Sequence, residues 1–239
     1  PNLRTRIETT TSGWISRWLK ICEATHVHGS QSPTLLDQRM ACLDSDRVML
    51  AAAVRQLQVG DRALMQRAAR LSVFDRDGER CETQDLSRRT PVPVLGPERE
   101  RYARPRSVAA EQYVLSAMGR NPNGPLAVLD GLKVGAESHP DVIRLVENAR
   151  AEAYRQLDRD KEAYAAWSKA ARAADAGGDD VSFVNVASVL AFMDVQDFDR
   201  LDAAEVWLER AQSRAETIEL PYATRFVLAL RGAVVTRFR

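Results

Sequence analysis

Two cysteines and two histidines in the first quarter of the chain come nearest to a metal-binding set. Cys22 and His26 are four residues apart and would share one face of a helix. His28 and Cys42 follow within twenty residues. A structural zinc site needs four converging ligands, usually in closely spaced pairs such as CxxC or HxxxH. Because no such pairs occur here and both histidines fall in the loop HVHGSQ, we expect no metal site.

The same region raises the possibility of a disulfide. Cys22 and Cys42 lie at similar distances on either side of that loop. On two antiparallel helices, their Cα atoms could come within disulfide range. Two interpretations stay open. One is a Cys22–Cys42 bridge worth roughly 3 kcal/mol for a loop of about twenty residues, which leaves Cys81 free. The other is a pair of buried thiols that fill space between helices.

The sequence lacks the motifs of kinase and hydrolase chemistry. A protein kinase needs a glycine-rich loop, a strand lysine, an HRD-type loop and a DFG aspartate. The nearest match, Asp197-Phe198-Asp199, has no glycine. There is no GxSxG motif, and three histidines leave few candidates for a general base. We therefore expect a chain that is not an enzyme and binds no cofactor.

Charge and hydropathy argue against two kinds of partner. The 239 residues carry a formal net charge of +1, so no net field gathers nucleic acid. No apolar run approaches the eighteen or so residues of a membrane helix. We expect neither nucleic-acid binding nor membrane contact in this chain. Because it begins at Pro1, we also expect it to be part of a longer protein.

The clearest structural pattern runs from residue 149 to 174, ARAEAYRQLDRDKEAYAAWSKAARAA. It predicts two short helices joined at a polar corner, Asp158–Asp160. Alanines let the helices approach, and two aromatic side chains fill the remaining space. The small and aromatic residues resemble a tetratricopeptide (TPR) hairpin: Ala151, Tyr154, Ala163, Trp167 and Ala170. The alternative from one hairpin alone is an ordinary antiparallel helical pair.

Further copies favour a repeat array. Ala204, Leu208 and Ala211 repeat the spacing of the second helix 41 positions later, and a fainter copy begins at Ala127. The three copies are 36 and 41 positions apart, so their spacing is irregular and exceeds the 34 residues of a standard TPR unit. The sequence thus predicts an all-α protein, a helical hairpin followed by an irregular TPR-like superhelix (solenoid). Its helices should break near residues 119–125, 158–160, 177–180 and 197–199.

The expected organisation has three parts. Residues 1–12 are polar and predict a linker. Residues 13–105 predict an N-terminal helical region, with helices over 13–26, 33–57 and 60–74 followed by an irregular connector. Residues 106–239 predict the repeats. The array is expected to be truncated, because its last segment has the pattern of an opening helix whose partner is missing.

The segment WLKICEATHVHGSQSPTLLDQRMACL, residues 18–43, carries the most specific similarity. Together with Trp14, it resembles the region that follows the kinase domain in bacterial (myxobacterial-type) serine/threonine protein kinases with C-terminal TPR repeats. In that family the kinase domain comes first, usually followed by a single membrane helix. The similarity is loose over residues 60–105 and generic over the repeats.

This resemblance implies a non-catalytic sensory or protein-interaction region of a kinase. It would be either the extracytoplasmic portion of a membrane-anchored protein or a cytoplasmic region. The alternative is the helical-repeat regulatory region of a bacterial transcription factor or signalling ATPase. Such a protein would share the repeats but not the RMACL segment.

A TPR-like array exposes first-helix side chains on a concave surface, which commonly takes an extended peptide. We therefore expect a protein or peptide partner. The hairpin pattern places the following residues on that surface: Asn148, Glu152, Arg155, Gln156, Asn185 and Ser188. The alternative is a polar face with no occupant.

Overall fold

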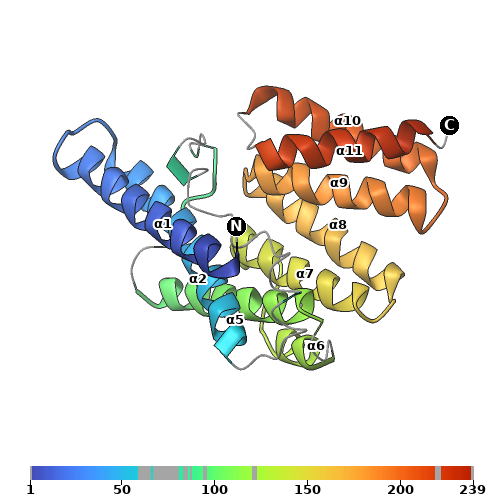
Figure 1. The fold of residues 1–239 in the computed structure, drawn as a ribbon, viewed down its shortest axis with the longest axis horizontal. Coiled ribbons are helices and arrows are strands. Elements are labelled where there is room, and N and C mark those ends of the chain that lie inside the picture. Colours follow the sequence, from blue (N-terminus) through green and yellow to red (C-terminus); the bar gives the residue numbers. More distant parts are fainter. Residues whose placement is uncertain are drawn as a thin grey trace. The chain divides into compact units, whose positions relative to one another are not determined.

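The computed structural model describes residues 2–58, 66, 81–82, 86, 88–93, 96–119, 123–218 and 222–237. Helices and their connections account for this part of the chain, which contains no β-strand (Figure 1). The all-α prediction is therefore confirmed. The chain divides into two compact units. Unit 1 comprises Pro1–Ser87 and Pro91–Lys133, and unit 2 comprises Arg88–Thr90 and Val134–Arg239.

Unit 1 begins with a helical hairpin of α1 (Leu3–His26) and α2 (Pro33–Gln58). The expected linker over residues 1–12 is wrong, because α1 starts at residue 3. Asn2 caps the helix, its side-chain oxygen accepting from the Thr5 amide at 2.9 Å. Leu3 and Ile7 then pack against an apolar cluster of the same unit. A cap and two apolar contacts thus make helical a stretch whose composition is mostly polar.

The remaining helices of unit 1 are α5 (Gly96–Ala117) and α6 (Asn123–Asp130). The irregular connector was expected to reach residue 105, but α5 begins at Gly96 and contains Pro105. Helix formation here outweighs the hydrogen bond that an internal proline loses. The expected helix over residues 60–74 lies outside the described residues. Two apolar clusters hold the described part of unit 1 together, one between α2 and α5 and one around Ile21, Leu43 and Leu86.

Unit 2 is a succession of helices that pack against their neighbours in the chain (Figure 1). They are α7 (Pro140–Arg155), α8 (Asp160–Ala176), α9 (Asp180–Gln196), α10 (Leu201–Thr217) and α11 (Tyr222–Arg237). The predicted breaks near 158–160, 177–180 and 197–199 are confirmed. The boundary expected at residue 105 is corrected, since unit 2 takes up the chain at Val134.

Two corners of unit 2 have the same backbone geometry. Asp158, between α7 and α8, has φ 55°, and Asp199, between α9 and α10, has φ 52°. Each is followed by an arginine that immediately precedes the next helix. Aspartate is one of the few residues that tolerate this left-handed conformation. The two hairpins therefore repeat at the same 41-residue spacing as their alanines.

The core of unit 2 is centred on α9, which packs against α8, α10 and α11. Its apolar residues lie all round the helix, as expected of one surrounded by others. Phe183, Leu190 and Met193 are almost completely buried. The alanines of the hairpin pattern are also fully buried, and Trp167 packs beside them. The predicted close approach of α7 and α8 is thus confirmed.

Candidate functional site

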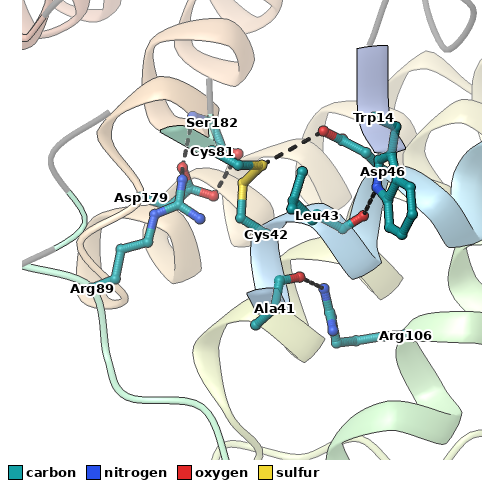
Figure 2. The surroundings of a disulfide bond; sticks show 10 residues. All are labelled: Trp14, Ala41, Cys42, Leu43, Asp46, Cys81, Arg89, Arg106, Asp179 and Ser182. Carbon is teal, nitrogen blue, oxygen red and sulfur yellow. Dashed lines mark hydrogen bonds and ion pairs between the residues drawn. A yellow bond between two sulfur atoms is a disulfide. The ribbon is translucent and has the colours of Figure 1, made fainter. Parts of the chain in front are cut away.

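The disulfide of this chain joins Cys42 to Cys81, with their Cα atoms 5.6 Å apart (Figure 2). Cys22 is a free, half-buried thiol, so both interpretations left open by the sequence, a Cys22–Cys42 bridge and a pair of buried thiols, are wrong. The reason lies in the face that α1 turns inward. Ile21 is 1% exposed and belongs to the same apolar cluster as Cys42. Equal distance from the loop places Cys22 and Cys42 at the same level of the two antiparallel helices. It does not determine whether their side chains point toward each other.

Short-range contacts surround the disulfide in unit 1. The Trp14 indole donates to the Leu43 carbonyl oxygen at 2.9 Å (Figure 2). The carboxylate of Asp46 lies 3.7 Å from the sulfur of Cys81. Next to Cys81, Glu82 forms an ion pair with Arg17 at 2.9 Å. These contacts fix the 81–82 stretch to the α1–α2 hairpin, which indicates a structural role for the bridge.

A metal site has no support in the described ranges. No group of three or more histidine, cysteine, aspartate or glutamate side chains there is placed to hold an ion. The candidate site is therefore the face of α7 and α9 on which the sequence places its hydrogen-bonding residues.

Asn148 occupies the middle of α7 but is committed to the neighbouring helix. Its side-chain oxygen accepts from the Trp167 indole of α8 at 2.9 Å. Trp167 is 8% exposed, so this bond satisfies a buried donor. Asn148 consequently positions the α7–α8 hairpin and is not a free polar group.

Arg155 lies at the end of α7 and bridges the two equivalent corners. Its guanidinium contacts Asp160 at the start of α8 at 2.6 Å and Asp197 at the end of α9 at 3.1 Å. A guanidinium carries several donors in a fixed plane, which suits it to two carboxylates at once. Arg155 thereby links the end of α7 to the end of α9.

Glu152 lies one turn before Gln156, whose amide nitrogen donates to its carboxylate at 3.1 Å. Burial raises the pKa of Glu152, although Gln156 and Arg155 act in the opposite direction. No ion pair to Glu152 is found among the described residues. Gln156 itself is exposed. This end of α7 therefore offers an amide and a partly desolvated carboxylate to a partner.

The two residues of α9 predicted to lie on the binding surface, Asn185 and Ser188, differ in exposure. Asn185 is exposed. Ser188 is 1% exposed and its hydroxyl donates to the Val184 carbonyl oxygen at 2.8 Å, so its assignment to the surface is wrong. The same side of α9 continues to Val189 and Phe192, which are half-buried: Val189 packs against the unit 2 core, and the Arg231 guanidinium lies 5.9 Å from the Phe192 ring. Helical periodicity counted from Asn185 could have identified these two apolar residues.

The sequence also gave no sign of a buried polar network between the α8, α9 and α10 helices. Asp194 is fully buried and accepts from the Tyr164 hydroxyl at 3.1 Å and from Arg200. The Trp207 indole in turn donates to the Tyr164 oxygen at 3.1 Å. Burial raises the pKa of Asp194, while its two donors oppose that effect. The network fixes the α9–α10 corner around the buried Asp194, and its Arg200 side chain reaches solvent, with 46% of its surface exposed.

Replacement of Asn148 by alanine is expected to lower the free energy of unfolding by about 1–3 kcal/mol. The change leaves the buried Trp167 N–H without an acceptor, and an unsatisfied buried donor costs about that much. Urea unfolding followed by far-UV circular dichroism measures the difference. Asn185→Ala is the matched control, because its exposed amide should change stability by less than about 0.5 kcal/mol. Equal effects of the two substitutions would contradict the assigned role of Asn148.

The chain matches no protein-family model, no curated protein and no solved structure. Within the part of the chain that the structure describes, none of the helices combines the length and the apolar content needed to cross a membrane.

Proposed function

We propose that the chain is a non-catalytic protein-interaction region of a bacterial serine/threonine protein kinase. It binds a protein or an extended peptide through a face of α7 and α9 formed by the exposed Gln156 and Asn185 and the half-buried Glu152, Val189 and Phe192. The observation that carries the proposal is the bridge from Arg155 to Asp160 and Asp197. It links the ends of two successive first helices, α7 and α9, across the intervening α8.

The chemistry of this face suits an extended backbone. Gln156 and Asn185 offer amide donors and acceptors, which can pair with peptide N–H and C=O groups. Val189 and Phe192 are half-buried on α9 and add a smaller apolar part to this face. Arg155 is already neutralised by two carboxylates, so it is not proposed as the group that grips a partner's carboxylate.

The link to a kinase rests on the segment from Trp14 to Leu43. The coding sequence upstream of Pro1 tests it directly. A domain with HRD and DFG motifs supports the proposal. A DNA-binding domain or a P-loop ATPase domain in that position would refute it in favour of the alternative parent.

Exchange of two exposed amides should weaken partner binding. Peptides would first be selected from a random display library on the immobilised chain, and their affinity measured by fluorescence anisotropy. For Gln156→Ala combined with Asn185→Ala we expect at least tenfold weaker binding, because loss of two hydrogen bonds of about 1 kcal/mol each exceeds the 1.4 kcal/mol of one decade.

The matched control is Gln212→Ala with Ser213→Ala, two exposed residues of α10. This pair should leave peptide affinity and melting temperature unchanged. The proposed face is refuted by selected peptides that bind both double variants equally well.

The chain should neither transfer phosphate nor respond to nucleotide. We expect no incorporation of γ-phosphate into itself or into a generic substrate protein. We also expect no rise in melting temperature with ATP and magnesium beyond that caused by equal ionic strength. Ligands that bind only the folded state raise its stability by mass action. A nucleotide-specific rise would therefore reveal a site and contradict a non-catalytic role.

A further inference from the structure

Three residues of the long connector belong to unit 2 although the residues before and after them belong to unit 1. This strap, Arg88–Thr90, lies on the corner between α8 and α9. The Thr90 amide donates to the Gly177 carbonyl oxygen at 3.0 Å. Arg89 contacts the Asp179 carboxylate at 2.6 Å (Figure 2), and Arg88 contacts Asp180 at 3.4 Å.

The corner that receives the strap is a built site. The carboxylate side chains of Asp179 and Asp180 are only 8% and 7% exposed. Ser182 fixes Asp179 by donating through its hydroxyl at 2.7 Å and its amide at 3.2 Å (Figure 2). The acceptor for Arg89 is thus held in place by the first turn of α9.

Gly178 lets the strap approach the corner. Its φ is +68°, and a Cβ added there would lie 2.1 Å from the Arg88 carbonyl oxygen. Real Cβ atoms do not come so close to a backbone oxygen, so only glycine allows this contact. The main chain of the strap and its two arginines therefore meet a surface shaped for them.

The two carboxylates of the corner form ion pairs both with arginines of neighbouring helices and with arginines of the strap. Arg144 of α7 contacts Asp179 at 3.3 Å, and Arg214 of α10 contacts Asp180 at 2.6 Å. Each carboxylate thus has one cation from a helix of unit 2 and a second from the strap. Removal of the strap would take away one guanidinium from each carboxylate and one donor from the Gly177 carbonyl.

We propose that the α8–α9 corner, Gly177–Asp180, is a binding site for an extended segment with two consecutive arginines. Residues 88–90 occupy it as an intramolecular ligand, which a di-arginine segment of another chain can replace. No covalent bond ties the strap to the corner. Its position in the same chain gives it a high effective concentration, so a competitor succeeds at high concentration or when the strap is weakened. This site is separate from the face of α7 and α9.

A synthetic peptide tests the proposal. The probe is fluorescein-labelled LSRRTPVP, the sequence of residues 86–93, titrated into the full chain with Arg88→Ala and Arg89→Ala. We expect saturable binding to this variant, and at least tenfold weaker binding to the original chain, whose corner is occupied. A control peptide with citrulline at both arginine positions keeps the shape but not the charge, and should bind at least tenfold more weakly. Equal binding of the two peptides, or none to the vacated corner, overturns the proposal.

A second measurement does not depend on the arginine variant. Gly178→Ala should displace the strap, whereas Gly29→Ala is a matched control with φ +59° and no atom within 4 Å of an added Cβ. We expect brief trypsin digestion to cut after Arg88 and Arg89 at least tenfold faster in Gly178→Ala than in Gly29→Ala, as measured by mass spectrometry. The Gly178→Ala chain should also fail to bind the probe peptide when combined with the two arginine substitutions. Equal cleavage rates, or retained binding, would show that the corner does not hold the strap as described.

Discussion

Substitution of Cys42 or Cys81 by serine is expected to lower the free energy of unfolding by about 4 kcal/mol. The two residues are 39 positions apart in the sequence. In the chain-entropy model, closing a loop of this size gives a stabilisation between those of a 15-residue loop, about 3 kcal/mol, and a 100-residue loop, about 4.7 kcal/mol. Urea unfolding with and without a reducing agent measures the effect, and reduction should shift the midpoint of the original chain but not of the Cys81→Ser variant.

The third cysteine provides the control. Cys22 is half-buried and unbonded, so Cys22→Ser should cost less than about 1 kcal/mol. Alkylation under denaturing, non-reducing conditions followed by mass analysis should modify one thiol, that of Cys22. Modification of Cys81, or an unfolding midpoint unaffected by reduction, would contradict the Cys42–Cys81 bridge.

The helical hairpins of unit 2 could be predicted from the sequence because local sequence signals agree with the packing of the helices there. Alanines at Ala163 and Ala170 mark the close face of α8, and the corner at Asp158–Asp160 ends the preceding helix. Those signals lie within one hairpin, so helical periodicity and turn chemistry suffice to predict it. The same reasoning found Asn185 as an exposed residue of α9.

Features that depend on contacts between distant residues could not be predicted in the same way. Whether Cys42 meets Cys22 or Cys81 depends on which face α1 turns inward, and that follows from the burial of Ile21. Ser188 lies three positions after Asn185, yet it faces the core because α9 packs against α8, α10 and α11. The strap on the α8–α9 corner joins residues about ninety positions apart, for which no local pattern exists.

Asp179→Asn is expected to lower the free energy of unfolding by about 3–5 kcal/mol at pH 7. The aspartate is buried and faces both Arg89 and Arg144, and removal of one charge from a buried ion pair costs about that much, while Arg144 keeps its ion pair with Asp141. Asparagine is as good an N-cap as aspartate, so the bond to the Ser182 amide can persist. The decrease in the free energy of unfolding therefore reports the contribution of the Asp179 charge and not that of its helix cap.

The pH dependence of this loss separates an electrostatic cause from a packing defect. Burial alone would raise the pKa of Asp179, but Arg89, Arg144 and the Ser182 hydroxyl outweigh it and the net pKa is lowered. A lowered folded-state pKa gives stability that is present above the unfolded pKa of about 3.9 and is lost as pH falls through the folded pKa. The two proteins would be compared by urea unfolding between pH 3 and 8. The difference in free energy of unfolding between the original chain and Asp179→Asn should therefore become smaller as the pH falls below about 4.

Asp194→Asn is the control with the opposite sign, because burial raises the pKa of Asp194. The stability from a raised carboxyl pKa is present below the unfolded pKa and is lost as pH rises through the folded pKa. As pH rises above about 4, the free energy of unfolding of the original chain should therefore decrease relative to that of Asp194→Asn. Over the same range, it should increase relative to that of Asp179→Asn. If both differences change in the same direction, or if neither changes with pH, the two buried aspartates do not have the opposite electrostatic roles that their surroundings indicate.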